Sequence, residues 1–156
     1  MTLKTTVSGR IAKPVHEVFE AVVDPAKLSK FFATGAGTKG RLESGATVMW
    51  DFHDFPGAFP VKVIEVVTDQ KVVLAWGAND DAAQGQSFVP HDNTVTIVFE
   101  GLDDGRTLVT ITEEGWGETP KGITASQRNT EGWAGMLVAM KAWLEHGINV
   151  RQGLYK

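Results

Sequence analysis

The sequence predicts an α+β fold in which one antiparallel sheet packs against a long C-terminal helix. Residues 129–147 carry a wide apolar stripe at helical spacing. Five apolar segments between residues 46 and 115 follow one another through short turns, which favours an antiparallel meander. Two short helical segments come before them, after an opening strand. The chain has 156 residues and no linker, so we expect a single domain, residues 1–156.

The first elements follow from alternation and capping. The segment "LKTTVSGRI", residues 3–11, alternates apolar and polar residues, which is typical of a strand. Pro14 then begins a short helix with an apolar face. A second short helix is predicted within "DPAKLSKFF", residues 24–32, with Asp24 as its N-cap and Pro25 at its first position.

The middle of the chain is predicted to form the sheet. Together with the opening strand its segments give six or seven strands, the weakest being "TKGRLE" at residues 38–43. A polar gap rich in small residues, 78–92, predicts a loop. The five stronger segments are "ATVMWDF", "FPVKVIEVV", "KVVLAWG", "NTVTIVFE" and "TLVTITEEG".

The last helix has a face that changes character along its length. Its apolar residues fall within one third of the circumference, and they are Trp133, Met136, Leu137, Met140, Trp143 and Leu144. Toward the N-terminus the same stripe continues through Asn129 and Thr130, which are polar. Gly147 is placed to end the helix in a left-handed conformation.

Strand alternation supplies a matching inner face for this helix. The inward rows are Val48, Trp50 and Phe52; Val72, Leu74 and Trp76; and Val95, Ile97 and Phe99. In the last strand Val109 and Ile111 point inward, and so does Glu113 by the same period. A carboxylate that continues an inward apolar row is the most informative polar residue of the sequence.

Composition narrows the function classes. The 15 basic and 19 acidic residues give a net charge of −4 without a basic cluster, so we expect neither nucleic acid nor membrane insertion. There is no cysteine, and the four histidines lack metal-ligand spacing, so we expect no metal and no cofactor. The N-terminus lacks the apolar segment of a signal peptide, which makes a cytoplasmic location the expectation.

At this level of detail the chain resembles a known family. The order strand, two short helices, antiparallel strands and long helix is similar to the helix-grip fold of the START-like (SRPBCC) superfamily. The local pattern looks like the branch named after the activator of the heat-shock-protein-90 ATPase, although "KFF" replaces the tryptophan usual after the second short helix. The matching segments are "IAKPVHEVFEAVVDPAKLSKFF", "VVLAWG", "RTLVTITEEGW" and "EGWAGMLVAMKAWLEHG".

The resemblance implies a strongly curved sheet that wraps the long helix and leaves an apolar cavity between them. We therefore expect a small apolar or aromatic molecule to bind there. The alternative is a solid core, in which Trp and Met side chains fill the space. The candidate ligand-binding residues are Trp50, Phe52, Trp76, Ile97, Phe99, Glu113, Asn129, Trp133, Leu137 and Met140.

Two other functions remain open. An enzyme of the cyclase or dehydratase kind would use Glu113, the one catalytic candidate, because burial favours the neutral acid that can donate a proton. If Glu113 instead reaches solvent or pairs with a basic residue, that role disappears. A chaperone partner is the third class. In the eukaryotic activators the helix-grip domain is joined to a separate N-terminal domain that this sequence lacks, so we expect no stimulation of a chaperone. The sequence does not specify an oligomeric state.

Trp133 should stand where the apolar and polar ends of the cavity meet. With open space beside its side chain, Trp133→Ala would cost less stability than Trp143→Ala, if Trp143 belongs to the packed flank of the helix.

Overall fold

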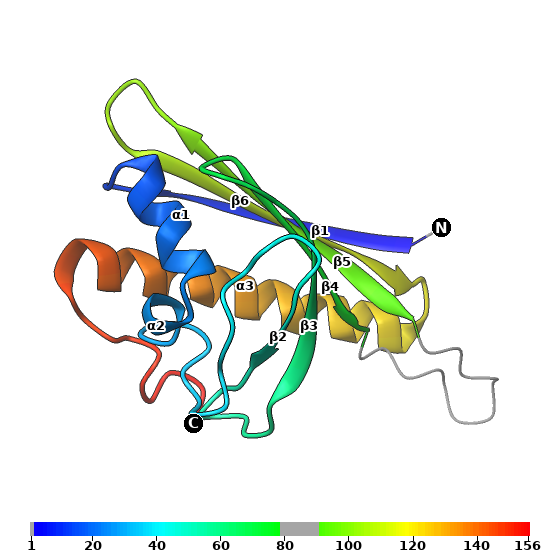
Figure 1. Ribbon diagram of the computed structural model, residues 1–156. Coiled ribbons are helices and arrows are strands. Elements are labelled where there is room, and N and C mark those ends of the chain that lie inside the picture. Colours follow the sequence, from blue (N-terminus) through cyan, green and yellow to red (C-terminus); the bar gives the residue numbers. More distant parts are fainter. Residues whose placement is uncertain (1, 79–90) are drawn as a thin grey trace.

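The computed structural model describes residues 2–78 and 91–156 and confirms the predicted fold class. A six-stranded antiparallel sheet with strand order β1-β6-β5-β4-β3-β2 curves around one long helix, α3 (Figure 1). The strands are β1 (Thr2–Ile11), β2 (Thr47–Trp50), β3 (Phe59–Val67), β4 (Lys71–Gly77), β5 (Asp92–Gly101) and β6 (Thr107–Gly117). The helices are α1 (Val15–Val23), α2 (Pro25–Leu28) and α3 (Pro120–His146).

Two predictions about the sheet need comment. The weak strand expected over residues 38–43 is wrong, because Lys39 makes only an isolated bridge with Met49. The loop predicted over residues 78–92 lies outside the described residues except at its ends. There the amide of Ala78 donates to the carbonyl of His91 over 2.9 Å, and Asp92 already belongs to β5.

The long helix begins at Pro120, nine residues before the predicted start. Thr119 is its N-cap, and the Thr119 side chain accepts a hydrogen bond from the amide of Gly122 over 3.0 Å. A threonine followed by proline is a helix-start signal, and it is visible in the sequence. The helix ends as predicted, with Gly147 in the left-handed conformation at φ 67°.

The short helix α2 confirms its predicted cap. The Asp24 carboxylate accepts from the amide of Ala26 over 2.9 Å, and Pro25 occupies the first helical turn. The helix ends at Leu28, earlier than the predicted segment, and the turn after it brings Phe31 and Phe32 into the core.

The core beneath the C-terminal half of α3 contains fully buried apolar side chains. Met136 and Met140 are fully buried and belong to the same apolar cluster as Ile97 and Ile111 of the sheet. Across β5 and β6, Ile97 pairs with Ile111 and Val95 pairs with Glu113, so these predicted inward rows lie side by side. Burial of this kind is what the filled-core alternative expects for this part of the molecule. No helix among residues 2–78 and 91–156 is both long and apolar enough to cross a membrane.

Candidate functional site

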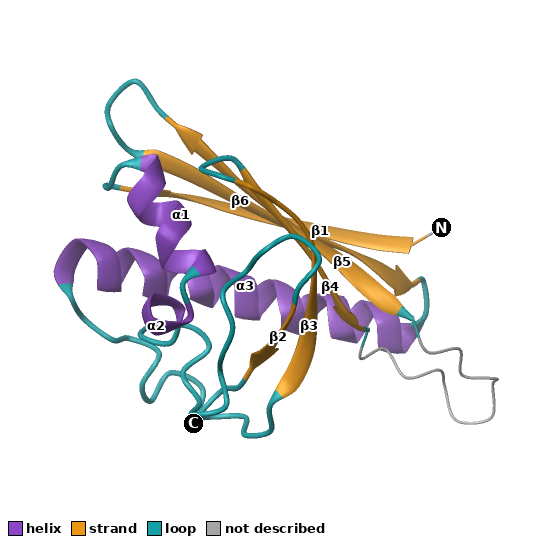
Figure 2. Ribbon diagram, viewed as in Figure 1, coloured by secondary structure: helices purple, strands orange, loops and turns teal. Residues whose placement is uncertain are grey.

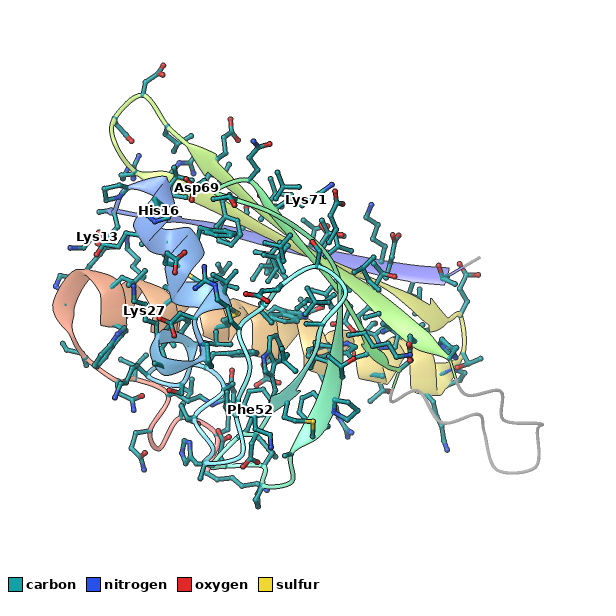
Figure 3. All side chains as sticks on the ribbon, in the orientation of Figure 1. Lys13, His16, Lys27, Phe52, Asp69 and Lys71 are labelled. Carbon is teal, nitrogen blue, oxygen red and sulfur yellow. The ribbon has the colours of Figure 1, made fainter. Side chains whose placement is uncertain are left out.

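A pocket of about 1030 Å³ lies beside the N-terminal half of α3, where β3 and β4 meet the loops and the C-terminal segment. Figure 2 shows the segment after α3 running beside the loops that follow α2 and β2. Phe52 lies at this end of the molecule, away from His16 and Asp69 (Figure 3). Seven lining residues are aromatic: Phe32, Phe52, Phe55, Phe59, Trp76, Trp133 and Tyr155. The other lining residues are Pro60, Lys62, Ala75, Gly77, Asp92, Arg128, Asn129, Glu131, Gly132 and Arg151.

Glu113 is the polar centre behind this wall. Its side chain is fully buried, and both carboxylate oxygens accept hydrogen bonds. Oε1 accepts from Trp133 Nε1 over 2.7 Å and from Asn129 Nδ2 over 3.1 Å. Oε2 accepts from Trp76 Nε1 over 2.9 Å, from Asn93 Nδ2 over 2.9 Å and from Asn129 Nδ2 over 3.0 Å.

These contacts decide between the readings of Glu113. The Glu113 side chain neither reaches solvent nor pairs with a cation. The alternative of a solvent-exposed or ion-paired Glu113 is therefore wrong. All four partners are donors, and a carboxylate offers about four lone-pair sites. No site is left for a ligand or a transferred proton. The geometry therefore favours a positioning residue, one that fixes two indoles and two amides.

The two anchored indoles belong to a stack of three rings. Trp133 lies between Phe32 and Trp76, with ring centroids 5.4 and 5.3 Å away and interplanar angles of 22° and 21°. Trp50 meets Trp76 edge-on at 5.6 Å. Rings held through both their faces and their N–H groups have little freedom to move, so this wall of the pocket is rigid.

The predicted site residues divide into three groups. Phe52, Trp76, Asn129 and Trp133 line the pocket. Glu113 lies directly behind them through its hydrogen bonds to Trp76, Asn129 and Trp133. The remaining five belong to the packed core and do not line the pocket: Trp50, Ile97, Phe99, Leu137 and Met140. Strand and helix parity identified inward residues correctly but could not tell core from cavity.

The expectation about the two helix tryptophans is wrong in its premise. Trp133 borders the pocket as predicted, yet only 3% of its surface is exposed and its ring stacks with those of Phe32 and Trp76. Trp143 is only partly buried and packs against the outside of the core. The order of the two stability costs should therefore be reversed.

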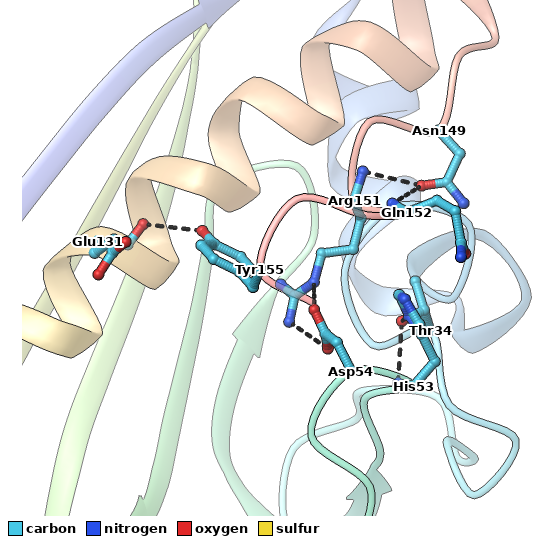
Figure 4. A network of polar contacts seen from close by, with 8 residues as sticks. All are labelled: Thr34, His53, Asp54, Glu131, Asn149, Arg151, Gln152 and Tyr155. Atoms are coloured by element: carbon cyan, nitrogen blue, oxygen red, sulfur yellow. Dashed lines mark hydrogen bonds and ion pairs between the residues drawn. The ribbon is translucent and has the colours of Figure 1, made fainter.

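Sequence reasoning missed an ion pair in the pocket wall. Arg151 Nε donates to Asp54 Oδ2 over 2.8 Å, and Arg151 Nη2 donates to Asp54 Oδ1 over 3.0 Å (Figure 4). The guanidinium carbon also lies 5.0 Å from the ring centroid of Phe52 and 4.9 Å from that of Tyr155. Both partners come from irregular segments, where no periodicity marks a residue as buried.

Asp54→Asn should give a pH-dependent loss of stability. Burial raises the pKa of Asp54, but the hydrogen bonds and charge of Arg151 lower it by more, to below the ordinary value of 3.8. Because the pKa of Asp54 is lower in the folded than in the unfolded state, its ionised form stabilises the fold above about pH 4. This stabilisation is lost as the pH falls further. We expect a cost of about 1–2 kcal/mol near neutral pH, measured by urea unfolding, which shrinks in stronger acid. A cost that is independent of pH would contradict the ion pair.

Tyr155 connects the C-terminal segment to α3 through a hydrogen bond. Its hydroxyl donates to the carbonyl oxygen of Glu131 over 3.4 Å, and burial raises the pKa of Tyr155 above 10.0, which keeps the donor protonated. A Cβ atom at Gly135 would lie 2.0 Å from this hydroxyl, whereas a Cβ atom at Gly132 would meet nothing within 4 Å.

The two glycines form a matched pair of variants. Gly132→Ala should raise the free energy of unfolding by about 0.5–1 kcal/mol, because alanine favours the helix. Gly135→Ala has the same helical gain but must expel the Tyr155 hydroxyl, so we expect little or no net gain and faster proteolysis of the C-terminal segment. Urea midpoints and limited proteolysis measure both effects. Equal stabilisation of the two variants would contradict the docking of Tyr155.

Within the described ranges no three His, Asp or Glu side chains gather as metal ligands. The pocket instead offers rings, amide and guanidinium donors, and a rim on which Lys62 pairs with Asp92 at 2.7 Å. Such a lining can hold a flat apolar body and donate hydrogen bonds to it.

We compared the chain with known protein families and solved structures. The family model described as "Activator of Hsp90 ATPase homolog 1-like protein" matches residues 12–145. No curated protein gives a significant match.

Solved structures share the fold across nearly the whole chain. The protein SSP2350 from Staphylococcus saprophyticus is similar at 27% identity and a TM-score of 0.76, with 96% of each chain covered. The Aha1 dimer from Colwellia psychrerythraea is similar at 18% identity and a TM-score of 0.71, covering 93% of this chain and 98% of that one. DynU16, from the dynemicin biosynthetic locus, has 24% identity and a TM-score of 0.71, covering 92% of this chain and 48% of its own.

Proposed function

The chain belongs to the Activator of Hsp90 ATPase homolog 1-like family, within the START-like superfamily, and from this premise we propose that it binds a small, flat aromatic molecule. The ligand would lie in the pocket between β3, β4 and the N-terminal half of α3. The proposal requires no metal, cofactor, nucleic acid or chaperone.

The aromatic lining carries this proposal. Seven of the lining residues are Phe, Trp or Tyr, and aromatic faces prefer to stack on other flat apolar rings. The volume of about 1030 Å³ is at the upper end for small-molecule sites and would accommodate several fused rings. An apolar surface of this kind that is left open to water is unfavourable, and such surfaces commonly mark ligand-binding sites.

The rigidity of the wall supports binding over catalysis. Both carboxylate oxygens of Glu113 accept hydrogen bonds that hold the side chains of Trp76, Asn93, Asn129 and Trp133 in place. A site whose walls are fixed before the ligand arrives avoids the entropic cost of ordering side chains on binding. The same contacts leave Glu113 no free lone pair, which weakens the cyclase or dehydratase alternative.

Displacement of an apolar fluorescent probe tests the proposal. Phe59 lines the pocket and stacks on Phe52 at 5.9 Å, so Phe59→Ala should weaken probe binding by about threefold to tenfold, the usual value of one aromatic contact. Ile64 lies on the same strand with 57% of its surface exposed, and Ile64→Ala is the control that should leave affinity unchanged. No saturable binding by the wild-type protein would remove the proposed function.

A further inference from the structure

Arg151 is an unusual residue of the pocket, because its guanidinium is almost completely buried among aromatic rings. Only 5% of the residue is exposed, and it lines the pocket. Asp54 holds Nε and Nη2, while the rings of Phe52 and Tyr155 lie within 5.0 Å of the guanidinium carbon. Figure 4 shows Arg151 between Asp54 and Tyr155. The direction of the guanidinium is thereby fixed.

The third nitrogen of this guanidinium is unused. An arginine has five N–H donors, and the two on Nη1 have no acceptor among the described residues. Nη1 keeps some exposed surface, because the fully buried side-chain nitrogen and oxygen atoms without partners in the described part are Asn93 Oδ1 and Trp116 Nε1. Since Arg151 lines the pocket and Asp54 occupies Nε and Nη2, Nη1 is the guanidinium nitrogen available to a ligand there.

The surrounding charges specify which acceptor fits. The charge of Arg151 is already balanced by Asp54, whose side chain is 1% exposed. At the rim, Lys62 pairs with Asp92, and the lining also holds Arg128 and Glu131, one charge of each sign. A ligand carboxylate would bring a second anion to a neutral pair and would lose its hydration without full compensation. A neutral oxygen acceptor needs only one N–H group of Nη1 and costs much less to desolvate.

We propose that Arg151 determines ligand specificity by donating a hydrogen bond from Nη1 to a neutral carbonyl oxygen on a flat aromatic ligand. This inference rests on the proposed function and narrows the ligand to an aryl ketone, aldehyde or ester. Asp54 is the positioning residue that aims the guanidinium, and the aromatic wall binds the ring.

Three naphthalenes that differ in one substituent test the inference by competition with the bound fluorescent probe. They are 2-ethylnaphthalene, 2-acetylnaphthalene and 2-naphthoate. We expect the ketone to bind about tenfold more tightly than the ethyl compound, as one hydrogen bond from a charged donor provides. The carboxylate should bind more weakly than the ketone.

Arg151→Lys provides the matched variant. A lysine keeps the ion pair with Asp54 but loses the second, fixed pair of donors, so the preference for the ketone should vanish while the ethyl compound binds as before. The control is Arg41→Lys, because Arg41 makes a bidentate pair with Glu20 on the surface, at 2.9 and 2.7 Å, away from the pocket. It should retain the tenfold preference.

The possible outcomes distinguish a failure of this inference from a failure of the proposed ligand-binding function. Equal affinity of wild-type protein for the ketone and the ethyl compound would overturn the inference and leave the proposed function standing. Tighter binding of the carboxylate would overturn the choice of a neutral acceptor. Failure of all three naphthalenes to displace the probe would overturn both. The comparison of ligands on wild-type protein stands even if Arg151→Lys does not fold.

Discussion

Trp133→Ala is expected to lower the free energy of unfolding by about 3–5 kcal/mol, the usual cost of deleting a buried tryptophan. The substitution removes the middle ring of the stack formed with Phe32 and Trp76. It also leaves Glu113 Oε1 without its shortest hydrogen bond, at 2.7 Å. Ligand binding should weaken as well, because Trp133 lines the pocket. Urea unfolding and probe titration measure the two effects.

The control for this variant is Trp143→Ala on the same helix. Trp143 is only partly buried and lies outside the pocket lining, so it should cost clearly less stability and leave probe affinity unchanged. Equal destabilisation by the two variants, with unchanged binding in both, would mean that Trp133 is an ordinary core residue and that the pocket is not a binding site.

Glu113→Gln is expected to cost about 2–5 kcal/mol, although the two side chains have nearly the same shape. The glutamine side chain has one oxygen and one NH2 group, so two or more donors of the cluster must face another donor. The amides of Asn93 and Asn129 can turn, and Asn93 Oδ1 is free to accept. The indoles of Trp76 and Trp133 cannot turn, because an indole N–H only donates. Each buried donor left without an acceptor costs about 1–3 kcal/mol.

Glu114→Gln is the matched control, one residue along the same strand. Glu114 points to the exposed face of β6, and its variant should change stability by less than about 0.5 kcal/mol. In Glu113→Gln, probe binding should weaken in step with the loss of stability, because the wall is no longer fixed. A Glu113→Gln variant that keeps its stability and binding but loses a measured turnover would instead support the enzyme alternative.

The sequence predicted the elements that follow from periodicity and capping. Alternation placed Glu113 on the inner face of β6, and helical spacing placed Asn129 and Trp133 toward it. The structure brings all three into contact. Asp24 and Gly147 act as caps for the reasons their residue types suggest. These features are local, so a short stretch of sequence contains the physical cause of each.

The rest of the site depends on contacts between distant segments. Asp54 and Arg151 are 97 residues apart and lie in loops, and Tyr155 reaches back to the carbonyl of Glu131. No pattern in the sequence marks such residues as buried. The division of inward residues into core and pocket also escaped prediction, because it depends on how far the sheet curves away from α3. Trp50 and Met140 share the parity of the lining residues but are buried in the packed core.

The most direct test of the binding pocket is the response of the five indole N–H signals in a ¹⁵N-edited NMR spectrum during titration with 2-acetylnaphthalene. Trp76 and Trp133 line the pocket, while Trp116 and Trp143 do not. We predict large, saturable shifts for Trp76 and Trp133, a smaller one for Trp50 through its contact with Trp76, and none for Trp116 or Trp143. Saturable shifts at Trp143 with none at Trp76 and Trp133, or no shift at any indole, would contradict a ligand site between the sheet and the N-terminal half of α3.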